Sequence, residues 1–140
     1  MAMQHTPLLM SKIIDRGAKV APNEEIVTAT ENGVRRQTYK ETRDRAHQLA
    51  HALADAGIAV GDRVGTFMWN GSRHLEAYQA CAGMGAVLHT LNIRLSEKDL
   101  EYIINHAEDQ IIIVDADILP LLEKLEAVSY THLTLPTMDS

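Results

Sequence analysis

The chain has 140 residues, a length that is typical of one domain and sufficient for a buried core. A net charge of −6 without a basic cluster, and an aromatic content of only 4%, argue against nucleic-acid binding, which needs a basic face or stacking platforms. The single cysteine, Cys81, excludes an internal disulfide and favours a reducing compartment, so we expect a cytoplasmic protein.

The sequence predicts neither a secretory signal nor a transmembrane helix. The apolar run near the start covers only residues 7–10, which is too short for a signal-peptide core. Residues 77–93 carry few charged groups, but this segment is shorter than the about 20 residues that a membrane-spanning helix needs. It also includes the polar residues Gln79 and Asn92.

The N-terminal part predicts a helix followed by a β-hairpin. Thr6 and Pro7 suit the cap and first turn of a helix that ends before Pro22. Its apolar face would consist of Leu9, Met10, Ile13 and Ile14. Two extended runs, residues 25–31 and 34–37, flank Asn32-Gly33, which predicts a hairpin turn whose two central residues have positive φ.

A second helix is predicted after the hairpin. Thr38 and Glu41 have the spacing of a capping box, in which each side chain bonds the backbone of the other residue. The helix should continue to about residue 56. Its inward positions would be Ala46, Leu49, Ala50 and Leu53.

Residues 62–115 predict strand, helix, strand, helix and strand. The strands are short apolar runs, as expected for parallel strands covered on both faces, at residues 63–69, 86–91 and 110–114. The helices cover residues 72–84, with the stripe Leu75, Tyr78 and Ala82, and residues 97–107, with Ser96 as cap and the stripe Leu100, Ile103, Ile104 and Ala107. The predicted fold class is therefore α/β, a parallel βαβαβ core preceded by a helix and a β-hairpin.

A last helix is predicted beyond the third core strand. Asp115 or Asp117 would cap it, and Pro120 is tolerated in its first turn. Its inward residues would be Ile118, Leu121, Leu122 and Leu125.

Two histidines form the first candidate site. His47 and His51 are four residues apart on one helix, with Asp44 and Asp55 on the same face, a spacing that can hold a metal ion. The sequence fixes no third ligand, and the same face carries Lys40, so a solvated surface is the simpler interpretation. A metal-binding protein stays open as an alternative, which titration with zinc would test.

Neither the glycines nor the cysteine predict a catalytic motif. Gly83-x-Gly85 lacks the third glycine of a dinucleotide loop and precedes a strand instead of following one, so Gly85 is interpreted as a helix terminator. No phosphate-binding loop of the Walker type occurs. Cys81 is predicted to be a buried structural thiol, because a nucleophilic cysteine would need a base and an electropositive setting, and His74 lies two turns away.

The carboxyl ends of the predicted core strands form the last candidate site. Trp69-Asn70-Gly71, Leu91-Asn92 and Asp115 follow the three strands, and ligands of open α/β sheets bind in the crevice at that edge. The alternative is that Asn70-Gly71 is only a tight turn and Asn92 only a loop residue.

Two adjacent segments carry a family resemblance. RHLEAYQACAGMGAVLHTLN (residues 73–92) and RLSEKDLEYIINHAEDQIIIVD (residues 94–115) resemble the N-terminal region of acyl-CoA synthetases of the adenylate-forming (AMP-binding) family, above all medium- and long-chain fatty-acid–CoA ligases. Upstream, QTYKE (residues 37–41) and AGIAVGDRVGTFMWN (residues 56–70) are similar to earlier blocks of that family.

The resemblance implies a two-step ligase reaction in the full-length enzyme. A fatty acid or related carboxylate attacks ATP to give acyl-AMP and pyrophosphate, Mg²⁺ helps to neutralise phosphate charge, and the thiol of coenzyme A then displaces AMP. The family's catalytic parts have no matching positions here, so we assign no catalytic, cofactor-binding or metal-binding residue. This chain alone is expected to be inactive and to bind none of the cofactors. The resemblance leaves a homodimer open, and a stand-alone, non-catalytic α/β binding module is the alternative function.

The C-terminal residues do not fit this pattern. VSYTHLTLPT (residues 128–137) resembles the translation of a transposon-end sequencing adaptor. We therefore predict that residues 1–127 are the incomplete N-terminal part of an AMP-binding domain and that residues 128–140 are not native.

Overall fold

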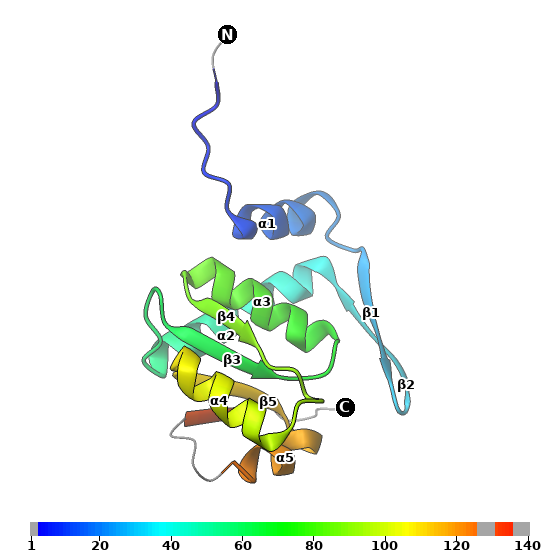
Figure 1. Ribbon diagram of the computed structural model, residues 1–140. Coiled ribbons are helices and arrows are strands. Elements are labelled where there is room, and N and C mark those ends of the chain that lie inside the picture. Colours follow the sequence, from blue (N-terminus) through cyan, green and yellow to red (C-terminus); the bar gives the residue numbers. More distant parts are fainter. Residues whose placement is uncertain (1–2, 126–130, 136–140) are drawn as a thin grey trace.

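The computed structural model describes residues 3–125 and 131–135 as helices, strands and connections (Figure 1). In chain order the elements are α1 (Met10–Val20), β1 (Glu25–Thr30), β2 (Gly33–Thr38), α2 (Tyr39–Asp55), β3 (Arg63–Phe67), α3 (Ser72–Met84), β4 (Val87–Thr90), α4 (Glu97–Ala107), β5 (Ile111–Asp115), η1 (Ala116–Ile118), α5 (Leu119–Glu123) and β6 (Thr131–Leu135). A four-stranded sheet has the order β4-β3-β5-β6, and β1 and β2 form a separate antiparallel hairpin.

The predicted parallel βαβαβ core is confirmed. β3 pairs in parallel with β4 on one side and with β5 on the other. In Figure 1, α2 and α3 lie on one face of the sheet and α4 and α5 on the other. β5 shows why the apolar run is continuous: Ile111 and Ile113 pack in the cluster with residues of α2 and α3, whereas Ile112 and Val114 pack in the cluster with residues of α4 and α5.

Local capping signals place the helix boundaries. The backbone N–H of Glu41 donates to Thr38 Oγ1 at 3.1 Å, and that of Asp99 donates to Ser96 Oγ at 3.2 Å. Such a cap contributes about 1 kcal/mol. Gly85 ends α3 with φ of 79°, a left-handed conformation that favours glycine, so the helix-terminator interpretation is confirmed.

The predicted buried stripe of α3 is wrong. Leu75 and Tyr78 are 36% and 49% exposed, and Ala82 is exposed too. The helix instead buries Ala77, Ala80 and Cys81, together with polar residues. Small side chains allow α3 to lie close to both the sheet and α2, and the larger apolar groups remain on the outside.

The predicted start of the first helix is also wrong. α1 begins at Met10, with Leu9 as N-cap and no side-chain cap, so Thr6 and Pro7 lie outside the helix. Its predicted apolar face is largely exposed, because the helix contacts the rest of the fold through a different side, on which only Ala18 is buried.

The hairpin is confirmed, but its turn is shifted by one residue. Thr30 pairs with Gly33, so Glu31 and Asn32 form the turn. Of the predicted turn pair, Gly33 has a positive φ of 124°, whereas Asn32 does not have a positive φ. The unusual conformation therefore falls on the residue without a Cβ atom.

The end of the core differs from the prediction in detail. Neither Asp115 nor Asp117 caps a helix through its side chain; the short helix η1 comes first, and α5 follows with Pro120 in its first turn. Ile118, Leu122 and Leu125 are buried as predicted, but Leu121 is 43% exposed.

Part of the segment predicted to be foreign forms an edge strand of the sheet. β6 pairs in parallel with β5 over five residue pairs, from Ile111↔Thr131 to Asp115↔Leu135. The other residues of 128–140 lie outside the described parts of the chain. The origin of this tail stays a prediction. None of the helices that the structure describes is long and apolar enough to cross a membrane.

Candidate functional site

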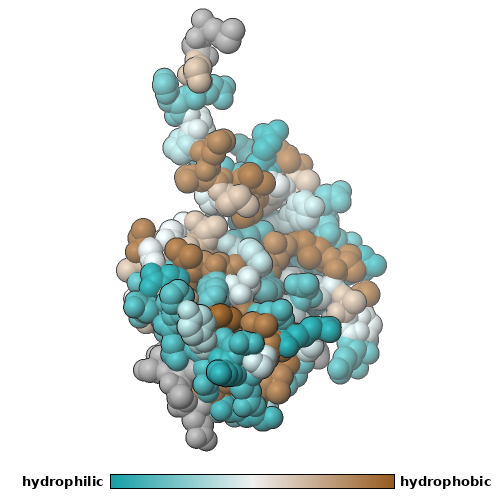
Figure 2. Space-filling model, in the orientation of Figure 1, coloured by the Kyte–Doolittle hydropathy of each residue, from teal (hydrophilic) through white to brown (hydrophobic). Residues whose placement is uncertain are grey.

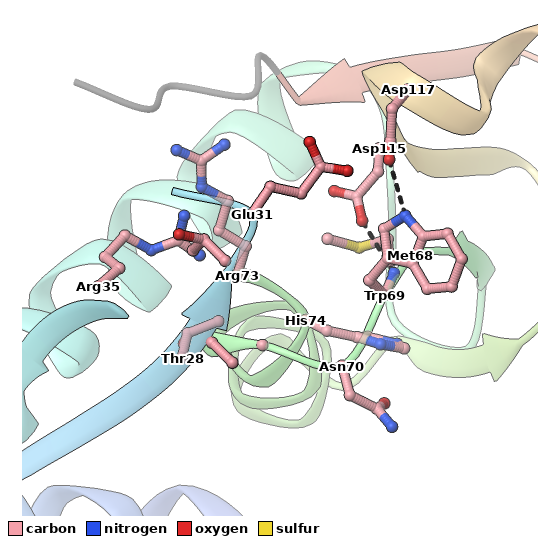
Figure 3. A pocket seen from close by; sticks show the side chains of 13 residues that line it. Thr28, Glu31, Arg35, Met68, Trp69, Asn70, Arg73, His74, Asp115 and Asp117 are labelled. Carbon is pink, nitrogen blue, oxygen red and sulfur yellow. Dashed lines mark hydrogen bonds between the residues drawn. The ribbon is translucent and has the colours of Figure 1, made fainter. Parts of the chain in front are cut away.

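A crevice of about 630 Å³ lies at the carboxyl ends of β3 and β5, beside the hairpin (Figure 3). It is lined by Thr28, Ala29, Thr30, Glu31, Arg35, Met68, Trp69, Asn70, Gly71, Arg73, His74, Asp115 and Asp117. In Figure 3, Arg35 and Arg73 lie on one side of this crevice, and Trp69, Asp115 and Asp117 lie on the other.

The hairpin is fixed to the start of α3. The backbone N–H of Ser72 donates to Thr28 Oγ1 at 3.0 Å, and Arg35 Nη2 donates to Ser72 Oγ at 3.2 Å. A Cβ atom on Gly71 would lie 2.9 Å from Thr28 Cγ2, which is too close for an ordinary contact. A glycine at this position therefore lets the hairpin approach α3 and close one wall of the crevice.

A buried polar cluster connects the hairpin to α2 and α3 and so stabilises the same wall. Glu76 Oε1 accepts hydrogen bonds from Gln37 Nε2 at 2.8 Å and from Arg45 Nε at 2.7 Å. Gln37 Nε2 also donates to Thr42 Oγ1 at 2.8 Å. These contacts join β2, α2 and α3, so the position of the hairpin depends on side chains far apart in the sequence.

Trp69 connects the ends of the two strands at the opposite wall. Its backbone N–H donates to Asp115 Oδ2 at 2.8 Å, and its indole Nε1 donates to Asp117 Oδ2 at 2.9 Å. The backbone N–H of Trp69 thus bonds to a side chain, in agreement with the end of β3 at Phe67.

Burial shifts the pKa of two groups at this wall. Desolvation raises the pKa of Asp115, helped by the charge of Asp117 and opposed by the Trp69 backbone, Arg73 and His74. Desolvation lowers the pKa of His74, opposed by Asp115 and the Trp69 backbone. His74 Nε2 lies 2.8 Å from Thr66 Oγ1, so the imidazole is held against β3.

The guanidinium of Arg73 lies in the same field. Desolvation lowers its pKa, and the neighbouring charges of Arg35 and Arg45 act in the same direction, opposed by Glu76 and Asp115. The crevice therefore presents cationic and anionic groups beside apolar ones such as Met68 and Ala29. Such an arrangement can bind and orient a polar ligand. Its lining contains no cysteine, and both of its hydroxyl side chains are engaged: Thr28 Oγ1 accepts the backbone N–H of Ser72, and Thr30 Oγ1 donates to the carbonyl oxygen of Gly33 at 3.1 Å.

Two of the three predicted strand ends lie at the crevice, and the binding of a ligand there stays a prediction. Residues 69–71 and Asp115 line the crevice, whereas Leu91 and Asn92 do not. Leu91 is buried in the core, and Asn92 Oδ1 accepts the backbone N–H of Arg94 at 2.9 Å, as a loop residue does. The hairpin residues Thr28, Glu31 and Arg35 were not predicted, because no local pattern indicates which wall a hairpin will form.

The two histidines of α2 lie elsewhere, in a groove of about 470 Å³ between α1, α2 and α3. His47 Nε2 is 3.9 Å from Asp15 Oδ1, and its side chain is 64% exposed. Among the residues that the structure describes, no three His, Cys, Asp or Glu side chains could together hold a metal ion. The described part of the chain thus supplies no third ligand for His47 and His51.

Cys81 is buried in the core, as predicted, with 0% exposure. Burial raises the pKa of its thiol to about 11, so the reactive thiolate is scarce at neutral pH. Its position beside Val64 and Ile113 explains this environment.

Comparison with known proteins identifies the family. A family model described as AMP-binding enzyme matches residues 14–138. The long-chain-fatty-acid–CoA ligase of Thermus thermophilus is 43% identical over 138 residues, which is 98% of this chain and 26% of that protein. The 3-methylmercaptopropionyl-CoA ligase of Ruegeria pomeroyi is 44% identical over 133 residues, 94% of this chain and 24% of that protein. The chain therefore spans about a quarter of the length of these relatives.

Solved structures match the fold. A fatty acyl CoA synthetase of Mycobacterium tuberculosis superposes with a TM-score of 0.78 at 23% identity, over 89% of this chain and 26% of that one. The N-terminal domain of FACL13 from the same organism gives a TM-score of 0.81 at 22% identity, over 94% of this chain and 34% of that one. The fold is thus that of the N-terminal region of adenylate-forming enzymes. Together with the family match over residues 14–138, this establishes that the chain belongs to the AMP-binding enzyme family.

Proposed function

We propose that this chain is the N-terminal part of a fatty acid–CoA ligase. The observation that carries the proposal is the 43% identity to the long-chain ligase of Thermus thermophilus over 138 residues. Residues 73–76 and 105–109 support it as well, because their sequence agrees with the ligase pattern. The full-length protein would join a fatty acid to coenzyme A through acyl-AMP, at the expense of ATP, in the cytoplasm.

Residues 62–115 would serve as scaffold in that enzyme. We assign no catalytic step to this chain, because the family's catalytic parts have no matching positions in its sequence. The groups that hold ATP phosphates would come from a Ser/Thr/Gly-rich loop further along the reading frame, and the frame should also encode a lysine on a smaller C-terminal domain.

The test is to recover the genomic locus and to express the complete protein with ATP, Mg²⁺, coenzyme A and a panel of fatty acids. We expect acyl-CoA formation by the complete protein. The purified 140-residue chain should show no ATP–pyrophosphate exchange that depends on fatty acid, since electrostatic stabilisation of the transition state is the largest catalytic contribution and its groups are missing. A stop codon near residue 127 in genomic sequence, or no product with any carboxylate, would contradict the ligase proposal.

The second candidate is a stand-alone binding module. The charged crevice beside Trp69 favours it, because such a space could bind a polar ligand without any catalytic group. A frame that ends near residue 127 would support this module. Sedimentation of the complete protein would test the homodimer that the resemblance leaves open.

We also propose that residues 128–140 come from a sequencing adaptor. Their deletion should leave the thermal midpoint of unfolding unchanged, since a foreign segment should stabilise the fold little. The pairing of β6 with β5 defines the opposite outcome: a clear fall in the midpoint on deletion would mean that this strand belongs to the fold.

A further inference from the structure

The outer side of α1 is an apolar surface that no described residue covers. Leu9, Met10, Ile13 and Val20 are 52%, 60%, 67% and 61% exposed. At 100° per residue these four side chains fall within about 100° of the helix circumference, so they form one outer strip. Leu8, just before the helix, is fully exposed as well. Figure 2 shows hydrophobic surface over the part of the molecule where α1 lies.

The outer strip is not the side on which α1 packs. Ala18 is buried, Ile14 is half-buried, and both lie on the side of the helix that faces α2 and α3. In Figure 1, α1 lies at one extreme of the molecule, with the N-terminal residues extending beyond it. A flat surface could therefore reach the outer strip without meeting the rest of the fold.

Basic side chains flank the outer strip along one side. Lys12, Arg16 and Lys19 are exposed and occupy the next sector of the helix. Within the described chain none of these three takes part in an ion pair. Asp15 is the only acid of α1 and lies toward His47. A cationic surface thus stands out on a protein whose net charge is −6.

We propose that α1 docks on an anionic lipid bilayer. The outer strip would enter the boundary between headgroups and acyl chains, and the three basic side chains would lie at the headgroup phosphates. This combination, a short helix with an exposed apolar strip and Lys or Arg beside it, is that of helices that lie in a membrane interface. Charge complementarity selects an anionic bilayer over a neutral one, because each Lys or Arg near an anionic surface strengthens binding about fivefold. The inference is independent of ligase activity and goes beyond the proposed function.

The test is flotation of the 140-residue chain with vesicles of phosphatidylcholine, with and without phosphatidylglycerol. We expect binding only to the anionic vesicles, and weaker binding as salt is raised. The double variant Lys12→Gln/Arg16→Gln should lower the partition coefficient about 25-fold. The double variant Met10→Gln/Ile13→Gln should lower it at least about tenfold, since it removes two exposed apolar side chains from the strip.

Matched controls carry the same chemical changes elsewhere. Lys40→Gln/Lys98→Gln removes two exposed charges, and Val27→Gln/Val34→Gln alters two exposed apolar residues of the hairpin; both should bind as the parent does. Circular dichroism of each variant establishes that it is folded. Absence of binding to anionic vesicles, or equal losses in the controls, would overturn the proposal.

Two results would assign the outer strip to another occupant. If the chain sediments as a dimer that Met10→Gln/Ile13→Gln dissociates, the strip is a contact between copies, and the bilayer proposal is wrong. If the 140-residue chain floats with anionic vesicles and the complete parent protein does not, the remainder of the parent covers the strip, and the proposal fails for that protein. Loss of ligase activity in the parent would affect neither readout.

Discussion

Replacement of Glu76 by alanine tests whether the buried polar cluster stabilises the hairpin against α3. Glu76 is 4% exposed, and its carboxylate accepts from Gln37 at 2.8 Å and from Arg45 at 2.7 Å. A hydrogen bond to a charged group contributes about 1.5–3 kcal/mol when both partners are buried, so we assign about 2 kcal/mol to the bond from Gln37. The side chain of Arg45 is 48% exposed, so solvent reduces its share to about 1 kcal/mol. The expected loss for Glu76→Ala is therefore about 3 kcal/mol.

Urea unfolding followed by far-UV circular dichroism measures this loss, provided that the slope m is unchanged. The control is Glu24→Ala, which removes an exposed carboxylate that has no side-chain partner among the described residues and should cost less than about 0.5 kcal/mol. Arg45→Ala, alone and combined with Glu76→Ala, isolates the coupling of that pair. If Glu76→Ala costs no more than the Glu24 control, the cluster does not stabilise the fold and our reasoning is refuted.

Three further predictions concern single residues. The Cys81 thiol should react slowly with a soluble disulfide reagent in the folded protein and quickly in denaturant, because it is buried and burial raises its pKa to about 11; rapid labelling of the native chain would contradict this. Ser96→Ala should cost about 1 kcal/mol in urea unfolding through the lost bond to the N–H of Asp99, and an unchanged midpoint would show that this cap is dispensable. Asp115→Asn tests the raised pKa of that carboxyl. Deprotonation of Asp115 should lower the free energy of unfolding of the parent as pH rises from 3.8 to the raised pKa, and the neutral amide makes no such contribution. The free energy of unfolding of the variant relative to that of the parent should therefore increase through that pH range. A difference that does not change with pH, or that changes in the other direction, would exclude a raised pKa.

The elements that local signals define could be predicted from the sequence. The hydroxyl caps Thr38 and Ser96 placed two helix starts correctly, because capping involves residues only three positions apart. The run IIIVD identified a doubly covered strand, since such a strand needs apolar side chains on both faces. The inner face of α3 could not be predicted in this way. Its buried residues are small, so the periodicity of large apolar side chains indicated the wrong side.

The candidate site shows the same limit. Trp69 and Asp115 were placed together by the general rule that parallel strands end at one edge of the sheet. Thr28 and Arg35 reach the same crevice through bonds to Ser72, across separations of 44 and 37 residues. No periodicity or spacing links positions so distant, because their contact depends on how the hairpin packs against α3. His74 was weighed only against Cys81, whereas its partner is Thr66 on the strand beneath it.

The position of Trp69 in the crevice makes its fluorescence sensitive to ligand binding. It is the only tryptophan of the chain, its side chain lies in the wall of the crevice, and it is 48% exposed. Indole emission depends on local polarity and on the hydrogen bond at Nε1, which here goes to Asp117. A molecule that enters the crevice displaces water from the indole or competes for that carboxylate, and either event shifts or quenches the emission. The intrinsic fluorescence of the unlabelled protein is therefore an optical probe of this crevice, and a screen of small polar molecules can be read from it directly.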